Sequence, residues 1–218
     1  MAYLSGDNII TSLGFDTSEV LSKIESGITG ITDTHSFKHL TKAPVSLVDF
    51  DIVSKELSFI FPEGSFTRLE GIASLSLYKA LKQVNIDLES NRTLFILSTT
   101  KGNIELLEGN EKPGKNLLLH HTAQKIASLF GFVNQPIVVC NACISGVLAL
   151  IMAKRYIETG KFDTIVVTGA DVATEFVVAG FESFKSMSEQ PCKPFDATRD
   201  GLSLGEGAGT LVITKNPN

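Results

Sequence analysis

Apolar positions follow two periods along this chain, and segments of the two kinds alternate. Short apolar runs predict buried strands at 1–10 (with a bend at Gly6), 93–98, 137–140, 163–169 and 210–214. Apolar residues three and four positions apart predict helices at 67–84, 119–130 and 144–157. Because strands alternate with helices, the fold class is α/β. We expect one domain over residues 1–218, with a mainly parallel five-stranded sheet covered by helices on both faces.

The first third of the chain carries weaker signals. Asp16 and Glu19 have the spacing of a capping box, and the apolar residues Val20, Leu21 and Ile24 predict a helix after them. Between 29 and 64 the pattern indicates only an edge strand near 45–50.

Composition excludes several classes of protein. Hydrophobic residues make up 43% of the 218 residues, enough for a sizeable core, and the net charge of -5 argues against a nucleic-acid surface. No apolar run has transmembrane length, and the first residues lack the pattern of a signal peptide. Three cysteines, an odd number, fit a reduced cytosolic protein without a disulfide framework.

The histidines do not indicate a metal site, and no pattern indicates a cofactor. His35, His39, His120 and His121 lack metal-ligand spacing with the cysteines. His120 and His121 are adjacent on a predicted helix and so point in two directions. We interpret them as a solvated pair.

Cys143 stands where a predicted strand gives way to a predicted helix. The amide groups and the dipole of a helix start favour an anion, so a thiolate is favoured there. Small neighbours, Ala142 and Gly146, leave room for a substrate, as at other nucleophiles on sharp strand-to-helix turns. The alternative is one more buried cysteine. The helix that follows is apolar on almost every side at first, which predicts that its first turns are enclosed.

The last thirty residues combine charges with glycines. Asp196, Arg199 and Asp200 are close enough in sequence to form a charge-assisted knot that pins an irregular loop. Glycines at 205, 207 and 209 allow the backbone to run close to another segment. The strand at 210–214 follows.

These residues resemble the β-ketoacyl-acyl-carrier-protein synthases of the elongating kind, which have the thiolase fold. The resemblance lies in the Cys-x-Pro-Phe-Asp-x-x-Arg-Asp-Gly run that starts at Cys192 and in Gly-Glu-Gly-Ala-Gly at 205–209. Asn141-Ala-Cys143 is similar to the family's nucleophile stretch. The turn Thr99-Thr-Lys-Gly102 departs from the family's glycine-rich turn at Lys101. The resemblance therefore does not determine the shape of the neighbouring pocket.

The resemblance implies that Cys143 accepts the acyl group as a thioester from acyl carrier protein. It further implies that Asp196, Arg199, Asp200 and Glu206 are structural, holding the segment that lies against the site. Cys140, within a strand, and Cys192, at the start of the pinned loop, are then expected to be structural too.

In the family, two histidines and a glycine-rich loop that completes the oxyanion hole come from a homologous second half. None of the four histidines here lies in a matching motif, so we expect this chain to be the amino-terminal half of a synthase. Alone it should not condense, and its bare apolar face should favour a homodimer or heterodimer. One alternative is a non-catalytic partner subunit of a synthase heterodimer. Another is a cysteine hydrolase, which the absence of a paired histidine argues against.

Overall fold

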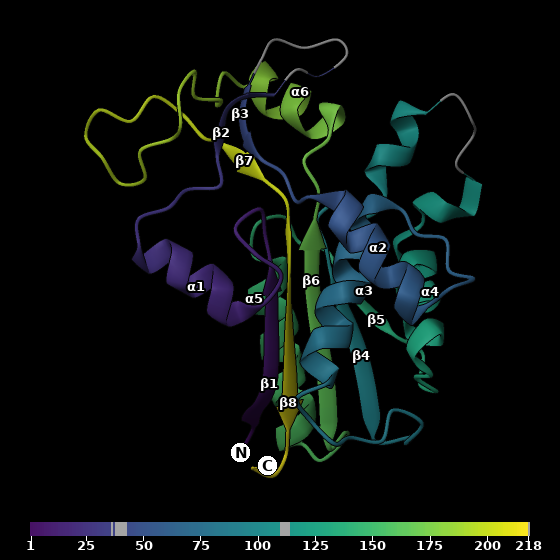
Figure 1. Ribbon diagram of the computed structural model, residues 1–218. Coiled ribbons are helices and arrows are strands. Elements are labelled where there is room, and N and C mark those ends of the chain that lie inside the picture. Colours follow the sequence, from purple (N-terminus) through teal and green to yellow (C-terminus); the bar gives the residue numbers. More distant parts are fainter. Residues whose placement is uncertain (36, 38–42, 110–113, 218) are drawn as a thin grey trace.

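The computed structural model describes residues 1–35, 37, 43–109 and 114–217. Its strands and helices follow one another along the chain as shown in Figure 1. In order, they are β1 (Tyr3–Ile10), α1 (Thr17–Glu25), β2 (Thr32–His35), β3 (Ala43–Ser46), α2 (Phe50–Ile60), α3 (Arg68–Leu81), β4 (Thr93–Ser98), α4 (Leu119–Phe130), β5 (Ile137–Val139), α5 (Ser145–Glu158), β6 (Thr164–Asp171), α6 (Glu175–Ser183), β7 (Leu204–Gly205) and β8 (Gly207–Thr214). Two short 3-10 helices, Ile104–Glu108 and Gly114–Leu117, lie between β4 and α4.

The central sheet has five strands in the order β1-β8-β6-β4-β5. β4 pairs in parallel with β5 and with β6, whereas β8 runs antiparallel to both of its neighbours, β1 and β6. The sheet is therefore mixed, and the expectation of a mainly parallel sheet needs this correction: the final strand enters the middle of the sheet in the opposite direction. The predicted bend in the first strand is confirmed, because the register shifts between Leu4 and Gly6.

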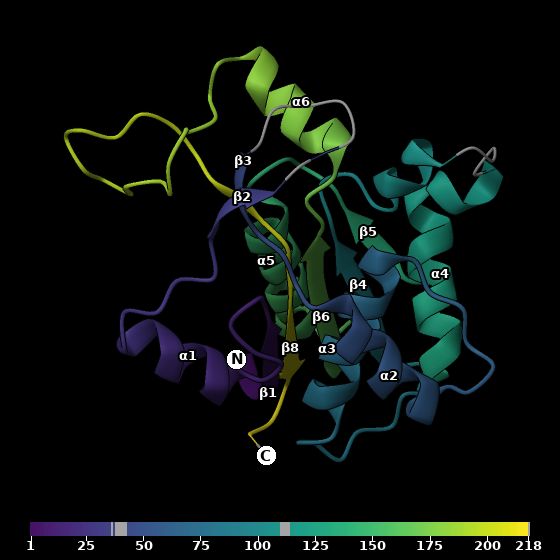
Figure 2. The same ribbon diagram turned by 45° about the horizontal axis from the view of Figure 1, so that its top comes forward.

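Side chains of the sheet alternate between two hydrophobic clusters, as the strand period of two requires. From β4, Phe95 and Leu97 join the cluster formed with α3 and α4, whereas Leu94 and Ile96 join the cluster formed with α5. Figure 2 shows α3 and α4 on one face of the sheet and α5 on the other. Helices thus cover both faces, as expected.

The helix predicted after Thr67 is the centre of the larger cluster. A complete capping box starts α3: the Thr67 hydroxyl accepts from the Glu70 amide, and the Glu70 carboxylate accepts from the Thr67 amide. Every residue from Leu69 to Leu77 is buried. A helix enclosed to this extent is fixed by packing more than by its propensity.

Helix α1 forms where it was predicted, but its apolar stripe is mostly exposed. Asp16 caps the helix by accepting from the Glu19 amide, while the Glu19 carboxylate accepts from Phe15 instead of closing the box. Val20 is buried, whereas Leu21 and Ile24 are 48% and 55% exposed. The helix lies against the edge strand β1, so only one row of its side chains reaches the core.

Two helices were not predicted. The expected edge strand near 45–50 ends at Ser46 as β3, which pairs with β2 and β7 in a small second sheet, and α2 starts at Phe50. Asp49 caps α2, and Val53 and Leu57 are its buried residues. Thr174 caps α6 in the same way.

The enclosure predicted for α5 is wrong. Only Ser145, Ala149, Ala153 and Ile157, one residue per turn, are buried against the sheet. On the opposite side Ile144, Val147 and Ile151 are 52%, 60% and 40% exposed. The described chain supplies no layer beyond α5, so its outer apolar row remains uncovered. We call these three residues the outer face of α5.

Candidate functional site

The segment between β5 and α5 is a tight turn that presents Cys143. Ala142 adopts a positive φ of 46°, a left-handed conformation that is strained for a residue with a side chain. The buried Ser145 hydroxyl accepts from the Asn141 amide and donates to the Ala142 carbonyl, both at 2.7 Å. Ser145 thereby fastens both sides of the turn. Sequence analysis did not single it out, although its place at the helix start was visible.

Cys143 is an exposed free cysteine at the meeting point of two hollows. One, of about 230 Å³, has mainly apolar walls that include Val172, Val177 and Phe181. The other, of about 300 Å³, extends along Ser145, Gly146 and the carboxyl end of β6. The thiol therefore has access to an apolar hollow and an open approach.

Cys140 is not enclosed by the sheet, which corrects the prediction. β5 ends at Val139, so Cys140 already belongs to the turn, where it is exposed. Its thiol donates to the Thr100 carbonyl at 3.3 Å. Cys140 and Cys143 also have Cys-x-x-C spacing, which the cysteine count alone does not reveal.

Asp171, at the carboxyl end of β6, binds the loop that follows β4. Its carboxylate accepts from the Thr100 amide at 2.9 Å, the Thr100 hydroxyl at 2.8 Å and the Thr99 hydroxyl at 3.1 Å. Lys101 donates to the same Thr100 hydroxyl at 3.0 Å. Asp171, Thr100 and Lys101 all line the apolar hollow with Cys143. Lys101 thus lies in the wall of the hollow, where it is held by its hydrogen bond to Thr100.

Glu206 is buried between three segments. Its carboxylate accepts from Arg68 Nε at 2.7 Å and from the amides of Val48 and Ala173 at 3.0 and 3.3 Å. Arg68 starts α3, Val48 precedes α2 and Ala173 precedes α6. The adjoining Gly205 and Gly207 line the hollows at Cys143, so Glu206 holds the chain directly behind their wall.

Asp196, Arg199 and Asp200 do not form the predicted charge-assisted knot. Within the described chain Arg199 makes no ion pair; it donates to the Asp196 carbonyl at 2.9 Å. The Asp196 carboxylate accepts from Thr198, which lowers its pKa, and Asp200 accepts from Ser188. All three residues are exposed on a loop that extends away from the sheet (Figure 1). Solvated charges gain little from pairing, and none of the three lines the hollows at Cys143.

The prediction of a solvated histidine pair is confirmed. His120 and His121 are exposed on α4, and neither lines a hollow at Cys143. His35 ends β2, and His39 lies outside the described residues. Among the described residues no group of histidine, cysteine and acidic side chains is arranged to hold a metal ion.

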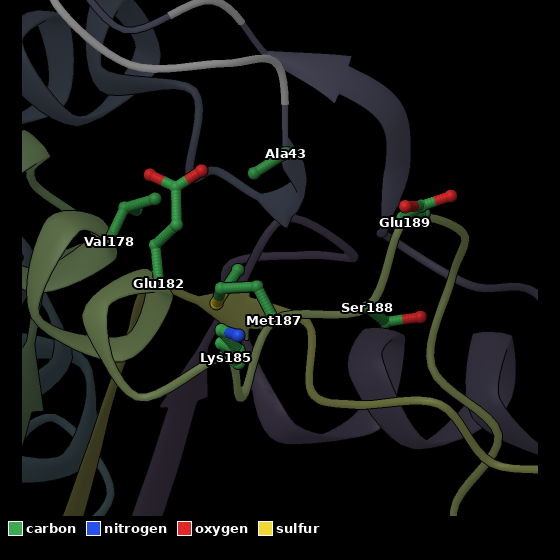
Figure 3. A pocket seen from close by; sticks show the side chains of 7 residues that line it. All are labelled: Ala43, Val178, Glu182, Lys185, Met187, Ser188 and Glu189. Atoms are coloured by element: carbon green, nitrogen blue, oxygen red, sulfur yellow. The ribbon is translucent and has the colours of Figure 1, made fainter.

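A further hollow, of about 370 Å³, lies between α6 and the segment 185–189, close to Ala43 (Figure 3). Cys143 is not among the residues that line it. In the described part of the chain no helix is both long and apolar enough to cross a membrane.

Comparison with known families identifies the chain's relatives. Residues 72–217 match the family model described as "Beta-ketoacyl synthase, N-terminal domain". Nodulation protein E of Rhizobium meliloti (strain 1021) is 24% identical over 96% of this chain and 56% of its own length. The 3-oxoacyl-[acyl-carrier-protein] synthase 2 of Staphylococcus aureus is 35% identical over 33% of this chain and 19% of its own. The chain thus spans little more than half of the first of these relatives.

Solved structures share the fold over the whole chain. The ketosynthase ApeO in complex with its chain length factor ApeC, from Xenorhabdus doucetiae, matches with a TM-score of 0.79 at 20% identity, over 100% of this chain and 58% of that one. A β-ketoacyl synthase from Burkholderia phymatum STM815 matches with a TM-score of 0.75 at 20% identity, over 99% and 59%. The predicted thiolase-like fold is therefore confirmed.

Proposed function

This chain belongs to the β-ketoacyl synthase family, through its N-terminal domain, and we propose that it carries the acyl-accepting half of a 3-oxoacyl-acyl-carrier-protein synthase. The observation that carries the proposal is the placement of Cys143: an exposed thiol on a strained turn, beside an apolar hollow that suits an acyl chain. Acyl carrier protein is the proposed donor, consistent with the activity named for the Staphylococcus aureus relative.

In the first step the Cys143 sulfur, as thiolate, attacks the carbonyl carbon of an acyl thioester. A new carbon–sulfur bond forms, the bond to the carrier's sulfur breaks, and the carrier thiolate takes up a proton. The thiol lies two residues before the start of α5, on the side of the helix whose dipole is favourable to an anion. In the second step, within the full enzyme, malonyl carrier protein loses CO₂. Its carbanion then attacks the Cys143 thioester and releases the thiolate.

Condensation requires donors for the enolate and the thioester oxyanion. Neither His120 nor His121 lies at the hollows of Cys143, so we propose that the described chain accepts an acyl group but does not condense. Loss of a single oxyanion donor typically lowers the rate about 10²–10³-fold. Loss of several should bring turnover below detection.

Intact-protein mass spectrometry tests the acyl transfer. Incubation with octanoyl-carrier protein should add one octanoyl group to the wild type and none to Cys143→Ser, with Cys192→Ser as the matched control that retains acylation. Further addition of malonyl-carrier protein should give no 3-oxoacyl product. An octanoyl group on Cys140 or Cys192 would contradict the assignment.

The second candidate is a partner subunit that shapes the pocket of an active synthase. The uncovered outer face of α5 favours it, together with the structural likeness to a ketosynthase bound to a chain length factor. The same experiment separates the two, because a silent partner leaves Cys143 unacylated under conditions in which iodoacetamide still alkylates it.

A further inference from the structure

The loop after β4 forms one wall of the apolar hollow beside Cys143. Thr100, Lys101 and Gly102 contribute to this wall. The loop contains a glycine with a positive φ of 60°, Gly102, whose amide donates to the buried Thr99 hydroxyl. Because Thr99 and Gly102 are buried, the polar groups of the loop need hydrogen-bond partners within the protein, and those partners fix its position.

Those hydrogen bonds converge on the two strands beside β4. On one side the Thr99 amide donates to the Val139 carbonyl of β5, which extends the parallel ladder by one residue. On the other side the Asp171 carboxylate of β6 accepts both threonine hydroxyls and the Thr100 amide. The carboxylate is therefore the main side-chain anchor of the wall.

The same loop also contacts the nucleophile turn. The Thr100 carbonyl accepts the Cys140 thiol at 3.3 Å, and Cys140 precedes the strained Ala142 and the nucleophile. A connected path therefore runs from Asp171 through Thr100 to the turn of Cys143. Asp171 itself does not bond Cys143 in the described structure, so any effect on the thiol acts through this path.

We infer that Asp171 is a positioning residue for acyl transfer: it holds the loop 99–102 at the distance from Cys143 at which the acyl chain fits between them. The inference rests on the proposed function of Cys143. Misplacement of a substrate by about 1 Å can cost about 10²-fold in rate, because a bound acyl group reacts only from a narrow set of orientations. A small alkylating reagent needs no such wall.

The test compares two reactions of the same thiol in the full chain. The first is acylation of Cys143 by octanoyl N-acetylcysteamine thioester, and the second is its alkylation by iodoacetamide, both followed by mass spectrometry under reducing conditions. We expect Asp171→Ala to slow acylation about 10- to 100-fold while the alkylation rate stays unchanged. Asp171→Asn, which keeps one oxygen acceptor, should show a smaller loss.

Thr100 supplies a matched pair of variants, since Thr100→Ser keeps the hydroxyl and Thr100→Val keeps the shape without it. Acylation should survive in the first and fall in the second. Asp196→Ala, at an exposed carboxylate on the distant loop, is the control and should leave both rates unchanged.

Three results would overturn the inference: wild-type acylation rates in Asp171→Ala, acylation and alkylation that fall by the same factor, or equal rates in the two Thr100 variants. Should Asp171→Ala unfold, the half-buried Cys192 would be alkylated faster, and Asp171→Asn with the Thr100 pair would then decide the question. A wild type that is alkylated but never acylated would overturn the proposed function, and this inference with it.

Discussion

The buried carboxylate of Glu206 accepts two hydrogen bonds from the guanidinium group of Arg68, 138 positions earlier in the chain, at 2.7 and 2.5 Å. The Glu206 side chain is 1% exposed and that of Arg68 is 30% exposed. This ion pair joins the start of α3 to the strand region behind Cys143, and Arg68 also donates to the Val48 carbonyl.

Removal of Arg68 should destabilise the protein strongly. Arg68→Ala leaves the Glu206 carboxylate buried without its countercharge, which typically costs about 3–5 kcal/mol. The free energy of unfolding from urea titration checks this. Arg92→Ala, at the half-exposed pair with Asp163, is the control and should cost only a small part of that loss. A loss from Arg68→Ala as small as that from Arg92→Ala would contradict the prediction. It would show that the hydrogen bonds from the Val48 and Ala173 amides are enough to stabilise the buried Glu206 carboxylate.

Asp196 and Arg199 should contribute little to stability. Both are exposed, and their hydrogen bonds stay within the loop. Asp196→Ala and Arg199→Ala are therefore expected to leave the melting temperature unchanged within error. A drop comparable to that of Arg68→Ala would mean that the loop packs against a surface outside the described chain.

Cys143 should be the most reactive of the three thiols. It is exposed close to the start of α5, whereas the Cys140 thiol donates a hydrogen bond to the Thr100 carbonyl. Cys192 is half-buried and far in sequence from any helix start. Limiting iodoacetamide with peptide mapping checks the order, under reductant because Cys140 and Cys143 have Cys-x-x-C spacing. Cys140→Ser should keep the labelling of Cys143. Preferential labelling of Cys192 would contradict the prediction.

Glu105 should make stability fall as pH rises. Burial raises its pKa above the ordinary 4.5, and the hydrogen bond from the Leu69 amide opposes this only in part. The folded state then binds the Glu105 proton more tightly than the unfolded chain does, so protonation of Glu105 stabilises the folded state. This stabilisation is complete below pH 4.5 and is lost as the pH rises through the raised pKa.

Glu105→Gln keeps an acceptor for Leu69 and carries no charge at any pH. Its free energy of unfolding relative to wild type should therefore increase from acid to neutral pH, measured by urea titration at several pH values. Glu63→Gln, at an exposed glutamate, controls for the loss of one negative charge. A difference that does not change with pH would refute the role of burial.

The outer face of α5 should drive self-association with a second copy of this chain. Ile144, Val147 and Ile151 form one exposed apolar row, a type of surface that monomers seldom leave open. Light scattering should give a dimer or larger species for the wild type and a smaller one for Val147→Asp. Phe59→Asp, at an exposed apolar residue on α2, should leave the wild-type mass. A monomeric wild type would contradict this prediction.

Much of the fold follows from local patterns. The strands β4 and β6 and the helix α3 were predictable because burial on both sides leaves continuous apolar runs in the strands and a regular apolar spacing in the helix. Helix α2 was missed, although Asp49 and the spacing of Phe50, Val53 and Leu57 carry the same signals in a shorter form. Helix α2 starts at Phe50, soon after β3 ends at Ser46. The change from the apolar spacing of a strand to that of a helix is therefore hard to see in the sequence.

The site was predictable only where its residues are close in sequence. The turn of Cys143 follows from its neighbours, but Asp171 meets Thr100 across 71 positions, and sequence periodicity does not show such a pair. The predicted ion pair between Asp196 and Arg199 was wrong although the two residues are close in sequence. Both side chains are exposed, and solvated charges gain little from pairing. The predicted enclosure of α5 was wrong because an apolar helix face indicates only that it can pack against another surface. It does not show that the described chain supplies that surface.

The order of the central sheet also has a consequence for how the chain reaches its native state. Among the described residues β1 has β8 as its only partner in the sheet, and β8 also pairs with β6. A nascent chain that has been made as far as α6 therefore holds β1 without a neighbour and β6 with one bare edge. Contacts this distant in sequence form slowly. Closure of the sheet must wait until β8 has been synthesised, and until then the exposed strand edges are open to chaperones and to mispairing.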